Sequence, residues 1–270
     1  MDRDKYPPET GRRRFVKGVI GSSALGSVGT AGAAAVNVST SPTGKGGGSV
    51  QAMVIENTDG PAPRGMSQIP VTIEDGYVKG VWPDATVEDG VAKEELGGVE
   101  YRSDWFQYCG VEAHPGLAPE ADLDNAFRAN EGKNYQWQRA AKEEGERYTV
   151  EDFADYETWN NDIGEAGVGK PAAATWRSQD AKKSIPVQIL RSKRIEEAAE
   201  DDEWLAASTE QGFIAWLNKC THYCCVPGFK HPPAMDSGSE NQVLCQCHQS
   251  TYDPFTQKLK TFPGRPRPSD

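Results

Sequence analysis

Four residues towards the carboxyl-terminal end of the chain have the types and spacing of metal ligands. Cys220 and His222 are separated by one residue, Cys245 and His248 by two, and 22 residues lie between the pairs. Two thiolates and two imidazoles could bind one zinc ion tetrahedrally. They also fit an iron–sulfur cluster in which one iron takes both thiolates and the other takes both imidazoles. The tight Cys-x-His spacing favours the cluster, because each loop then supplies one thiolate and one imidazole.

Further cysteines accompany these residues. Cys225 extends the first loop and Cys247 the second, and Cys224 stands beside Cys225. Five of the six cysteines fall within 28 residues, a clustering typical of a metal or disulfide site. A zinc site has no need of the additional cysteines. Two loops that hold a cluster at an exposed tip do need a tie, and a disulfide would provide one.

The pattern CTHxxC followed by CxCHxSxYD resembles the Rieske iron–sulfur proteins of cytochrome bc-type quinol oxidases, over roughly Ile185–Pro268. The resemblance implies a [2Fe-2S] cluster with Cys220 and Cys245 on a buried iron and His222 and His248 on an outer iron. It implies an all-β Rieske fold, with an antiparallel base sheet and a small cluster-binding subdomain, here interrupted by an irregular insertion.

The resemblance also implies a disulfide between Cys225 and Cys247. Cys224 is then a spare cysteine at a position where the family usually has glycine, and we expect a free or packed thiol there. A bridge from Cys224 to Cys247 remains an alternative.

Two polar residues after the second loop match hydrogen-bond donors of the family. Ser250 is expected to donate to a bridging sulfide and Tyr252 to the Cys220 thiolate, and such donors stabilise an added electron. We therefore expect a high-potential cluster. Because reduction raises the pKa of the ligating imidazoles, His248 is expected to accept a proton from a quinol and is the predicted catalytic residue.

Two departures from the family pattern stand out. Gln249 occupies a position where glycine is usual. The segment Phe262–Pro268 resembles the proline loop that covers the cluster, but the family normally continues from there with closing strands. Either strands from the N-terminal part replace them, or the sheet edge is open.

Composition narrows the function classes. The chain has 40 acidic and 29 basic residues and a formal net charge of -11, which argues against binding nucleic acid, since phosphates require Lys and Arg. A mean hydropathy of -0.66 excludes a multi-span membrane protein. The acidic balance suits a protein that stays soluble in concentrated salt, as in a haloarchaeal-like member of the family.

The N-terminal part of the chain resembles a targeting sequence. Arg12–Arg14 precede a weakly apolar stretch, Gly18–Val36, in the order of a Tat export signal. We expect residues 1–36 to be this signal or a membrane anchor, and residues 37–49, rich in Gly, Ser and Thr, to be a flexible linker. Export by Tat would place the protein on the outer face of the cytoplasmic membrane.

The remaining chain is expected to be β-rich. Residues 50–184 should form a β-containing region with an uncharacterised insertion, and residues 185–270 the Rieske domain. Strands are predicted at Val50–Ile55, Ile69–Ile73, Ile185–Arg191 and Gly212–Leu217, and a helix at Ala126–Glu144. Cys109 and His114, inside the insertion, are interpreted as structural.

These features predict a one-electron carrier that oxidises a quinol. The expected partners are a cytochrome b-type membrane subunit, the quinol, and a soluble acceptor such as cytochrome c or a copper protein. The alternative within electron transfer is the small Rieske subunit of a molybdenum oxidoreductase such as arsenite oxidase. A structural zinc-binding module is the alternative from a different class.

Overall fold

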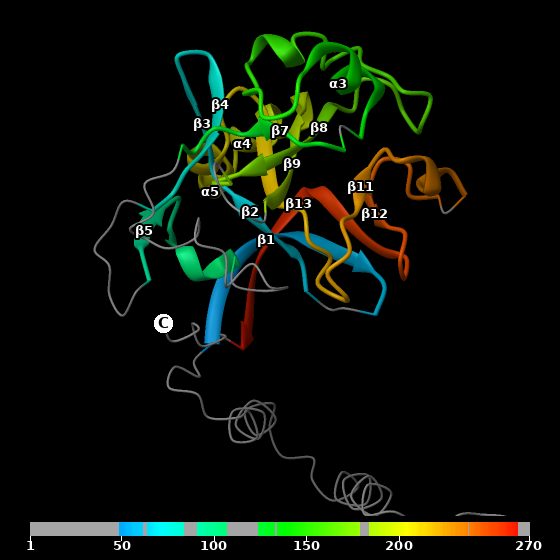
Figure 1. Cartoon of the computed structure of the whole chain (residues 1–270). Coiled ribbons are helices and arrows are strands. Elements are labelled where there is room, and N and C mark those ends of the chain that lie inside the picture. The colour runs from blue at the N-terminus through cyan, green and yellow to red at the C-terminus, as the bar shows by residue number, and fades with distance from the viewer. Residues whose placement is uncertain are drawn as a thin grey trace, which may run out of the picture. The chain divides into compact units, whose positions relative to one another are not determined.

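The computed structural model describes residues 49–61, 64–83, 91–106, 124–132, 134–178, 184–236 and 238–263. Within these residues the protein is mostly β structure, which agrees with the expected all-β class, and its main element is a curled nine-stranded antiparallel sheet (Figure 1). In sheet order the strands are β11 (Gly228–Phe229), β12 (Val243–Cys245), β13 (Ser250–Pro263), β1 (Ser49–Asp59), β2 (Met66–Ile69), β10 (Phe213–Leu217), β9 (Ile185–Arg191), β8 (Lys170–Trp176) and β7 (Arg128–Ala129).

Smaller elements accompany the sheet. Two hairpins pair separately, β3 (Val71–Glu74) with β4 (Tyr77–Gly80), and β5 (Lys93–Leu96) with β6 (Val99–Arg102). The described α-helices are short: α3 (Gln136–Ala141), α4 (Lys193–Ala199) and α5 (Glu203–Ser208). Single 3-10 turns occur at Ser103–Phe106, Glu151–Phe153 and Pro232–Asp236.

The first strand closes the sheet beside the last. β1 pairs with β13 along its length, from Ser49 opposite Pro263 to Asp59 opposite Thr251. It also pairs with β2, which continues the sheet to β10. The strand that pairs with β13 along its length is therefore β1, from the N-terminal part of the described chain. Ser49, expected to end a linker, already belongs to β1.

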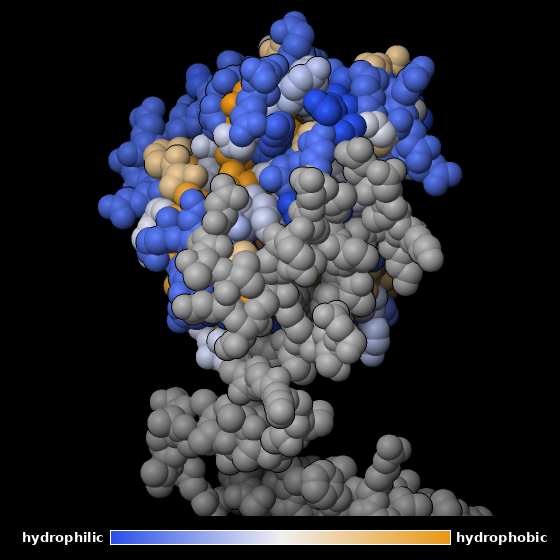
Figure 2. Space-filling model, turned by 60° about the vertical axis from the view of Figure 1, so that its left-hand side comes forward, coloured by the Kyte–Doolittle hydropathy of each residue, from blue (hydrophilic) through white to orange (hydrophobic). Residues whose placement is uncertain are grey.

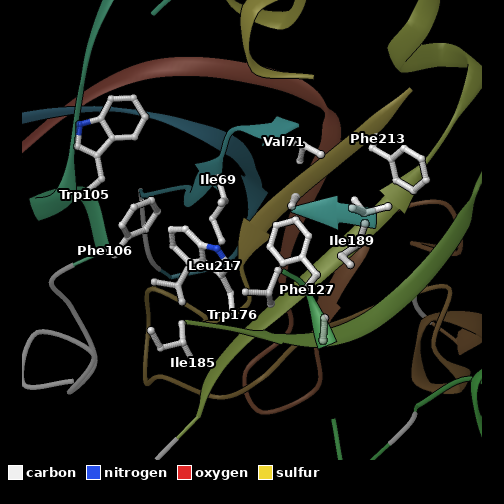
Figure 3. Packing of buried hydrophobic residues seen from close by; sticks show 14 of the residues in the cluster. Ile69, Val71, Trp105, Phe106, Phe127, Trp176, Ile185, Ile189, Phe213 and Leu217 are labelled. Carbon is white, nitrogen blue, oxygen red and sulfur yellow. The ribbon is translucent and has the colours of Figure 1, made fainter. Parts of the chain in front are cut away.

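Side chains of β10 alternate between two hydrophobic cores, as the period of a strand requires. Phe213, Ala215 and Leu217 belong to the larger core, in which they meet the aromatic side chains of the insertion (Figure 3). Ile214 and Trp216 face the smaller core, which also contains Cys220, Phe229, Val243, Cys245 and Tyr252. The two cysteines expected to hold the buried iron are thus part of a packed core.

The insertion contributes to the same sheet. β7 and β8 lie within residues 101–176 and extend the sheet beyond β9. β9 begins at Ile185, the residue where the second domain was expected to start. Trp105, Trp159 and Trp176 are buried. Their ring contacts are with other aromatic residues of the protein, so they are core residues.

Two secondary-structure predictions are wrong. The strand expected over Ile69–Ile73 is divided at Pro70, which cannot donate to a ladder, so Ile69 pairs within β2 and Val71 within β3. The helix expected over Ala126–Glu144 is confined to Gln136–Ala141, because the preceding residues form β7. The strands expected at Val50–Ile55, Ile185–Arg191 and Gly212–Leu217 are confirmed, with β10 beginning one residue later, at Phe213.

The described surface is largely polar. In the view of Figure 2 it is predominantly hydrophilic, with hydrophobic residues appearing in small separate areas. The described helices are too short or too polar to serve as membrane spans. The expected export signal lies outside the described residues.

Candidate metal centre

The first of the two loops begins where β10 ends. Cys220, three residues beyond Leu217, is 1% exposed, and its N–H donates to the carbonyl of Cys225 at 2.8 Å. Asn218 ties the far side of the loop by donating from Nδ2 to the carbonyl of Pro227 at 3.0 Å. The loop is therefore closed by the backbone around Cys220, and His222 is carried on its outer part.

The second loop is the turn between β12 and β13. Cys245 is the last residue of β12 and pairs with Ser250, the first residue of β13. Cys245 is 1% exposed, while His248, between the strands, is exposed. The hairpin thus fixes one ligand candidate inside the core and presents the other to solvent.

The two loops contain the same backbone hydrogen bond. In each, the residue four positions after the buried cysteine donates its N–H back to that cysteine's carbonyl, Cys224 to Cys220 at 2.9 Å and Gln249 to Cys245 at 2.8 Å. Both donors lie in the left-handed region, with φ of 63° for Cys224 and 59° for Gln249. These are the positions where the resembling family usually has glycine, which adopts this conformation without strain.

The buried thiols of Cys220 and Cys245 lie beside each other. The contact with Cys245 lowers the pKa of Cys220 to about 5 despite burial, and hydrogen bonds from the Tyr252 hydroxyl and the His222 backbone act in the same direction. The same contact and burial raise the pKa of Cys245. Tyr252 is fully buried and donates from its hydroxyl to Cys220 Sγ at 3.2 Å. The contact between the two thiols thus shifts their pKa values in opposite directions.

The imidazoles of His222 and His248 form a second pair. Their ring centroids are 4.6 Å apart, at an interplanar angle of 81°. The exposed ring of Tyr223 lies against both, with centroids 4.4 Å from His222 and 5.2 Å from His248. The structure thus brings together both expected histidines from different loops, with His248 exposed and His222 half-buried.

Two polar atoms at the site are buried and have no hydrogen-bond partner: Nδ1 of His222 and Oγ of Ser250. Such atoms are costly unless they gain a partner. A metal centre would give both atoms a partner. The imidazole nitrogen of His222 would be a ligand, and the hydroxyl of Ser250 would be a hydrogen-bond donor.

A disulfide joins the loops. Cys225 and Cys247 are bonded, which is the pairing that the resemblance implies. Within the described residues, three sulfur atoms lie within 4.8 Å of one another and could in principle hold a metal ion, those of Cys225, Cys245 and Cys247. Because two of those sulfurs are bonded to each other, that group is not a thiolate site. Cys220 and Cys245 remain thiols.

The expectation for Cys224 is wrong. We expected a free or packed thiol, but Cys224 is also disulfide-bonded. Its left-handed backbone and its bond to the Cys220 carbonyl fix the outer end of the first loop. Cys109 and His114 lie outside the described residues.

A turn from the N-terminal part covers the loops. The Cα of Ser250 lies so close to Gly60 that a Cβ on this glycine would come within 2.7 Å of it, and Thr221 donates from its hydroxyl to the carbonyl of Arg64 at 3.3 Å. The segment from Phe262 was expected to cover the cluster, but Pro263 pairs with Ser49, at the opposite end of β1 from Asp59. The described backbone that contacts both loops is thus the β1–β2 turn. The rest of the expected C-terminal proline loop lies outside the described residues.

The insertion also contacts the end of β11 and the start of the connection from β11 to β12. Lys230, immediately after β11, is fully buried and donates from Nζ to the carbonyls of Ile163, at 2.8 Å, and Glu165. Asn161 donates from Nδ2 to the carbonyl of Lys230 at 2.8 Å. Tyr135 donates from its hydroxyl to the carbonyl of Phe229 at 2.6 Å. Sequence reasoning missed these residues; the single signal was a lysine between Phe229 and His231 in otherwise uncharged sequence.

Comparisons of the chain with protein families, with curated proteins and with solved structures find no match.

Proposed function

We propose that this chain binds a Rieske-type [2Fe-2S] cluster through Cys220, His222, Cys245 and His248 and transfers single electrons, oxidising a quinol within a cytochrome bc-type complex. The observation that carries the proposal is that the four residues form two pairs, two buried thiols and two adjacent imidazoles of which His248 is exposed, on two loops tied by a disulfide. The finer fold assignment follows: β11, β12 and the loops are the cluster-binding subdomain, and the remaining sheet is the base.

The residues present fit the cluster. The orphaned Nδ1 of His222 supplies a ligand lone pair, and the orphaned Oγ of Ser250 supplies a donor for a bridging sulfide. Tyr252 already donates to Cys220 Sγ. The left-handed backbone of Cys224 and Gln249, at the family's glycine positions, further supports the resemblance.

A single zinc ion fits less well. A tetrahedral site with zinc–ligand bonds of about 2.0–2.3 Å would bring all four donor atoms within about 4 Å of one another. The two imidazoles do not join the thiols in a group of donor atoms of that size. Two separate pairs suit two iron atoms better than one zinc ion.

The chain's own residues would then have distinct roles. The cluster supplies a one-electron acceptor, and hydrogen bonds from Tyr252 and Ser250 to its sulfurs favour the reduced state. His248 is exposed, so its imidazole can hold the proton that a quinol gives up together with its electron. The exposed ring of Tyr223 lies against both imidazoles and would meet a partner together with them.

The partners and location are part of the proposal. We infer export by Tat through residues 1–36, attachment to the outer face of the membrane, a cytochrome b-type subunit as the site of quinol oxidation, and a cytochrome c or copper protein as acceptor. A gene for cytochrome b beside that of this chain would favour this assignment over a molybdenum oxidoreductase subunit.

The test of function is electron paramagnetic resonance of the dithionite-reduced protein in its membranes, with and without a quinol-site inhibitor. We expect a Rieske spectrum that shifts when the inhibitor binds. We expect His248→Ala to lose the cluster or quinol oxidation. Unchanged quinol turnover in that variant would refute the role of His248, and a spectrum indifferent to every quinol-site inhibitor would refute the quinol partner.

A further inference from the structure

We propose that Thr221 is a positioning residue. It directs the hydroxyl hydrogen of Tyr252 to the sulfur of Cys220, and it thereby couples the oxidation state of the metal centre to the β1–β2 turn. This inference rests on the proposed function. Thr221 is half-buried and stands in the first loop, between the expected ligands Cys220 and His222.

The ring of Tyr252 is held in place by the strand that carries it. Tyr252 is fully buried, and its backbone is paired with Asn57 of β1 on one side and with Val243 of β12 on the other. Rotation of the hydroxyl about its bond to the ring is the freedom that remains, so the hydrogen turns towards whichever acceptor is available. The groups around the phenolic oxygen therefore decide how much of the hydrogen bond Cys220 receives.

Two acceptors lie at the same distance from the phenolic oxygen of Tyr252. Sγ of Cys220 and Oγ1 of Thr221 are both 3.2 Å away from it. The N–H of Thr221, also at 3.2 Å, donates to this oxygen and occupies one of its lone pairs. Because the phenol has a single hydrogen, Cys220 and Thr221 compete for it unless the Thr221 hydroxyl itself acts as the donor.

The hydrogen of the Thr221 hydroxyl has two acceptors as well. One is the phenolic oxygen of Tyr252, and the other is the carbonyl of Arg64 in the β1–β2 turn, at 3.3 Å. Donation to Arg64 leaves the Thr221 oxygen as an acceptor for Tyr252. Donation to Tyr252 excludes this arrangement and sends the phenolic hydrogen to Cys220, in a chain of hydroxyls whose hydrogen bonds strengthen one another.

The oxidation state selects between these two arrangements. Reduction makes the sulfur of Cys220 more negative, and a hydrogen bond to a charged acceptor is roughly twice as strong as one between neutral groups. The reduced protein therefore favours the arrangement in which Thr221 donates to Tyr252 and Tyr252 donates to Cys220. In that arrangement the carbonyl of Arg64 loses the hydroxyl of Thr221, so reduction loosens the β1–β2 turn.

A double-mutant cycle tests whether Thr221 acts through Tyr252. Thr221→Val keeps the shape of the side chain and removes its hydroxyl, whereas Thr221→Ser keeps the hydroxyl. We expect Thr221→Val to lower the reduction potential by about 10–30% of the shift that Tyr252→Phe produces, and Thr221→Ser to keep the original potential. In the Tyr252→Phe background, Thr221→Val should add nothing. Additive shifts, or an unshifted potential in Thr221→Val, would overturn the inference.

Thr251→Val is the matched control. Thr251 precedes Tyr252 on β13, and its hydroxyl donates to the carbonyl of Gln249 in the second loop, at 3.5 Å. Removal of this hydroxyl should leave the reduction potential unchanged. A shift equal to that of Thr221→Val would show that the loss of any threonine hydroxyl beside the loops has this effect, and it would contradict the role of Thr221.

The second measurement needs no variant. Hydrogen–deuterium exchange, followed by mass spectrometry, compares the oxidised and the reduced protein. We expect the peptide that spans the β1–β2 turn to exchange about twofold faster or more in the reduced protein, and the peptide of β8, several strands away in the sheet, to exchange equally in both. Equal exchange of the turn in both states would overturn its coupling to the metal centre. Absence of a Rieske spectrum would refute the proposed function itself, whereas a Rieske spectrum with additive potential shifts would refute this inference alone.

Discussion

At the scale of single residues, the two loops are held by backbone conformations that their side chains disfavour. Cys224 and Gln249 both have positive φ, and each donates its N–H to the carbonyl of a buried cysteine. For a residue with a Cβ this conformation costs about 1–2 kcal/mol relative to the right-handed region. Cys224 also takes part in a disulfide, whereas Gln249 is an exposed residue with no such constraint.

Replacing Gln249 by Gly should therefore stabilise the protein. Relief of the left-handed strain exceeds the additional chain entropy of glycine, and we expect the free energy of unfolding to rise by about 0.5–1 kcal/mol. Denaturant unfolding measures it. Gln246→Gly, in the same loop but without a positive φ, is the control and should not stabilise. A gain of equal size in both variants would exclude strain at residue 249 as the cause.

The hydrogen bond from Tyr252 should affect the reduction potential. Tyr252→Phe keeps the buried ring and removes only the hydroxyl that donates to Cys220 Sγ. A hydrogen bond to a charged group contributes about 1.5–3 kcal/mol, so we expect the potential to fall by up to roughly 65–130 mV for a one-electron couple. Redox titration followed by circular dichroism measures it. An unchanged potential in a variant that retains its cluster would show that the bond is equally strong in both oxidation states.

At the scale of elements, a disulfide and an internal lysine hold the loops from opposite ends. Cys225–Cys247 ties the outer parts of the loops, and Lys230 ties the connection between β11 and β12 to the insertion. The insertion, residues 101–176, thereby has a structural role that its sequence does not reveal: it holds the connection that leads into β12, the strand before the second loop.

Removal of the disulfide should destabilise the protein. Closing a loop across 22 positions corresponds to about 3 kcal/mol in the chain-entropy model, so the double variant Cys225→Ser/Cys247→Ser should lose roughly that much stability. Thermal unfolding of the cluster-free protein measures the loss without a contribution from iron. Equal unfolding temperatures of the two proteins would contradict a stabilising role for this bridge.

The tie from Lys230 to the insertion can be tested with Lys230→Met. The methionine keeps most of the aliphatic stem but leaves the carbonyls of Ile163 and Glu165 without their shared donor, at a cost of about 2–3 kcal/mol. Lys258→Met is the control, because Lys258 is exposed and pairs with Glu56 at the surface, where ion pairs contribute little. Similar unfolding midpoints for the two variants would argue against this tie.

The elements that sequence predicted well are those with an uninterrupted pattern. Ile185–Arg191 forms a strand with the predicted bounds, since its apolar run has no competing signal. The predicted helix over Ala126–Glu144 was mostly wrong, because Arg128 and Ala129 pair with Thr175 and Ala174 of β8, which are distant in sequence. The pairing of Cys225 with Cys247 could be expected because the motif that implies it is local in sequence, whereas the covering β1–β2 turn is brought to the two loops only by the folded sheet.

At the scale of the whole molecule, one continuous sheet connects the insertion, the N-terminal strand and the ligand loops. Three buried tyrosines donate hydrogen bonds from their hydroxyls to backbone carbonyls: Tyr101 to Val81 at 2.7 Å, Tyr135 to Phe229 at 2.6 Å and Tyr148 to Ala173 at 3.1 Å. Burial raises the pKa of all three phenols above the ordinary value of 10.

Stability should therefore fall in alkaline solution. Above pH 10 the unfolded chain loses phenolic protons that the folded protein keeps, so this contribution is complete below pH 10 and declines as the pH rises above it. Tyrosinate absorbance and circular dichroism, recorded together, should show these three tyrosines ionising only as the protein unfolds. Their ionisation in a fully folded protein would contradict the burial described here.

The most direct test of the central claim is the iron and inorganic sulfide content of the purified chain, together with its paramagnetic resonance spectrum after reduction. We expect two irons and two sulfides per chain and a Rieske spectrum, and we expect the cluster and its spectrum to be lost in Cys220→Ser. Bound zinc without inorganic sulfide, in a folded protein that retains Cys225–Cys247, would contradict it.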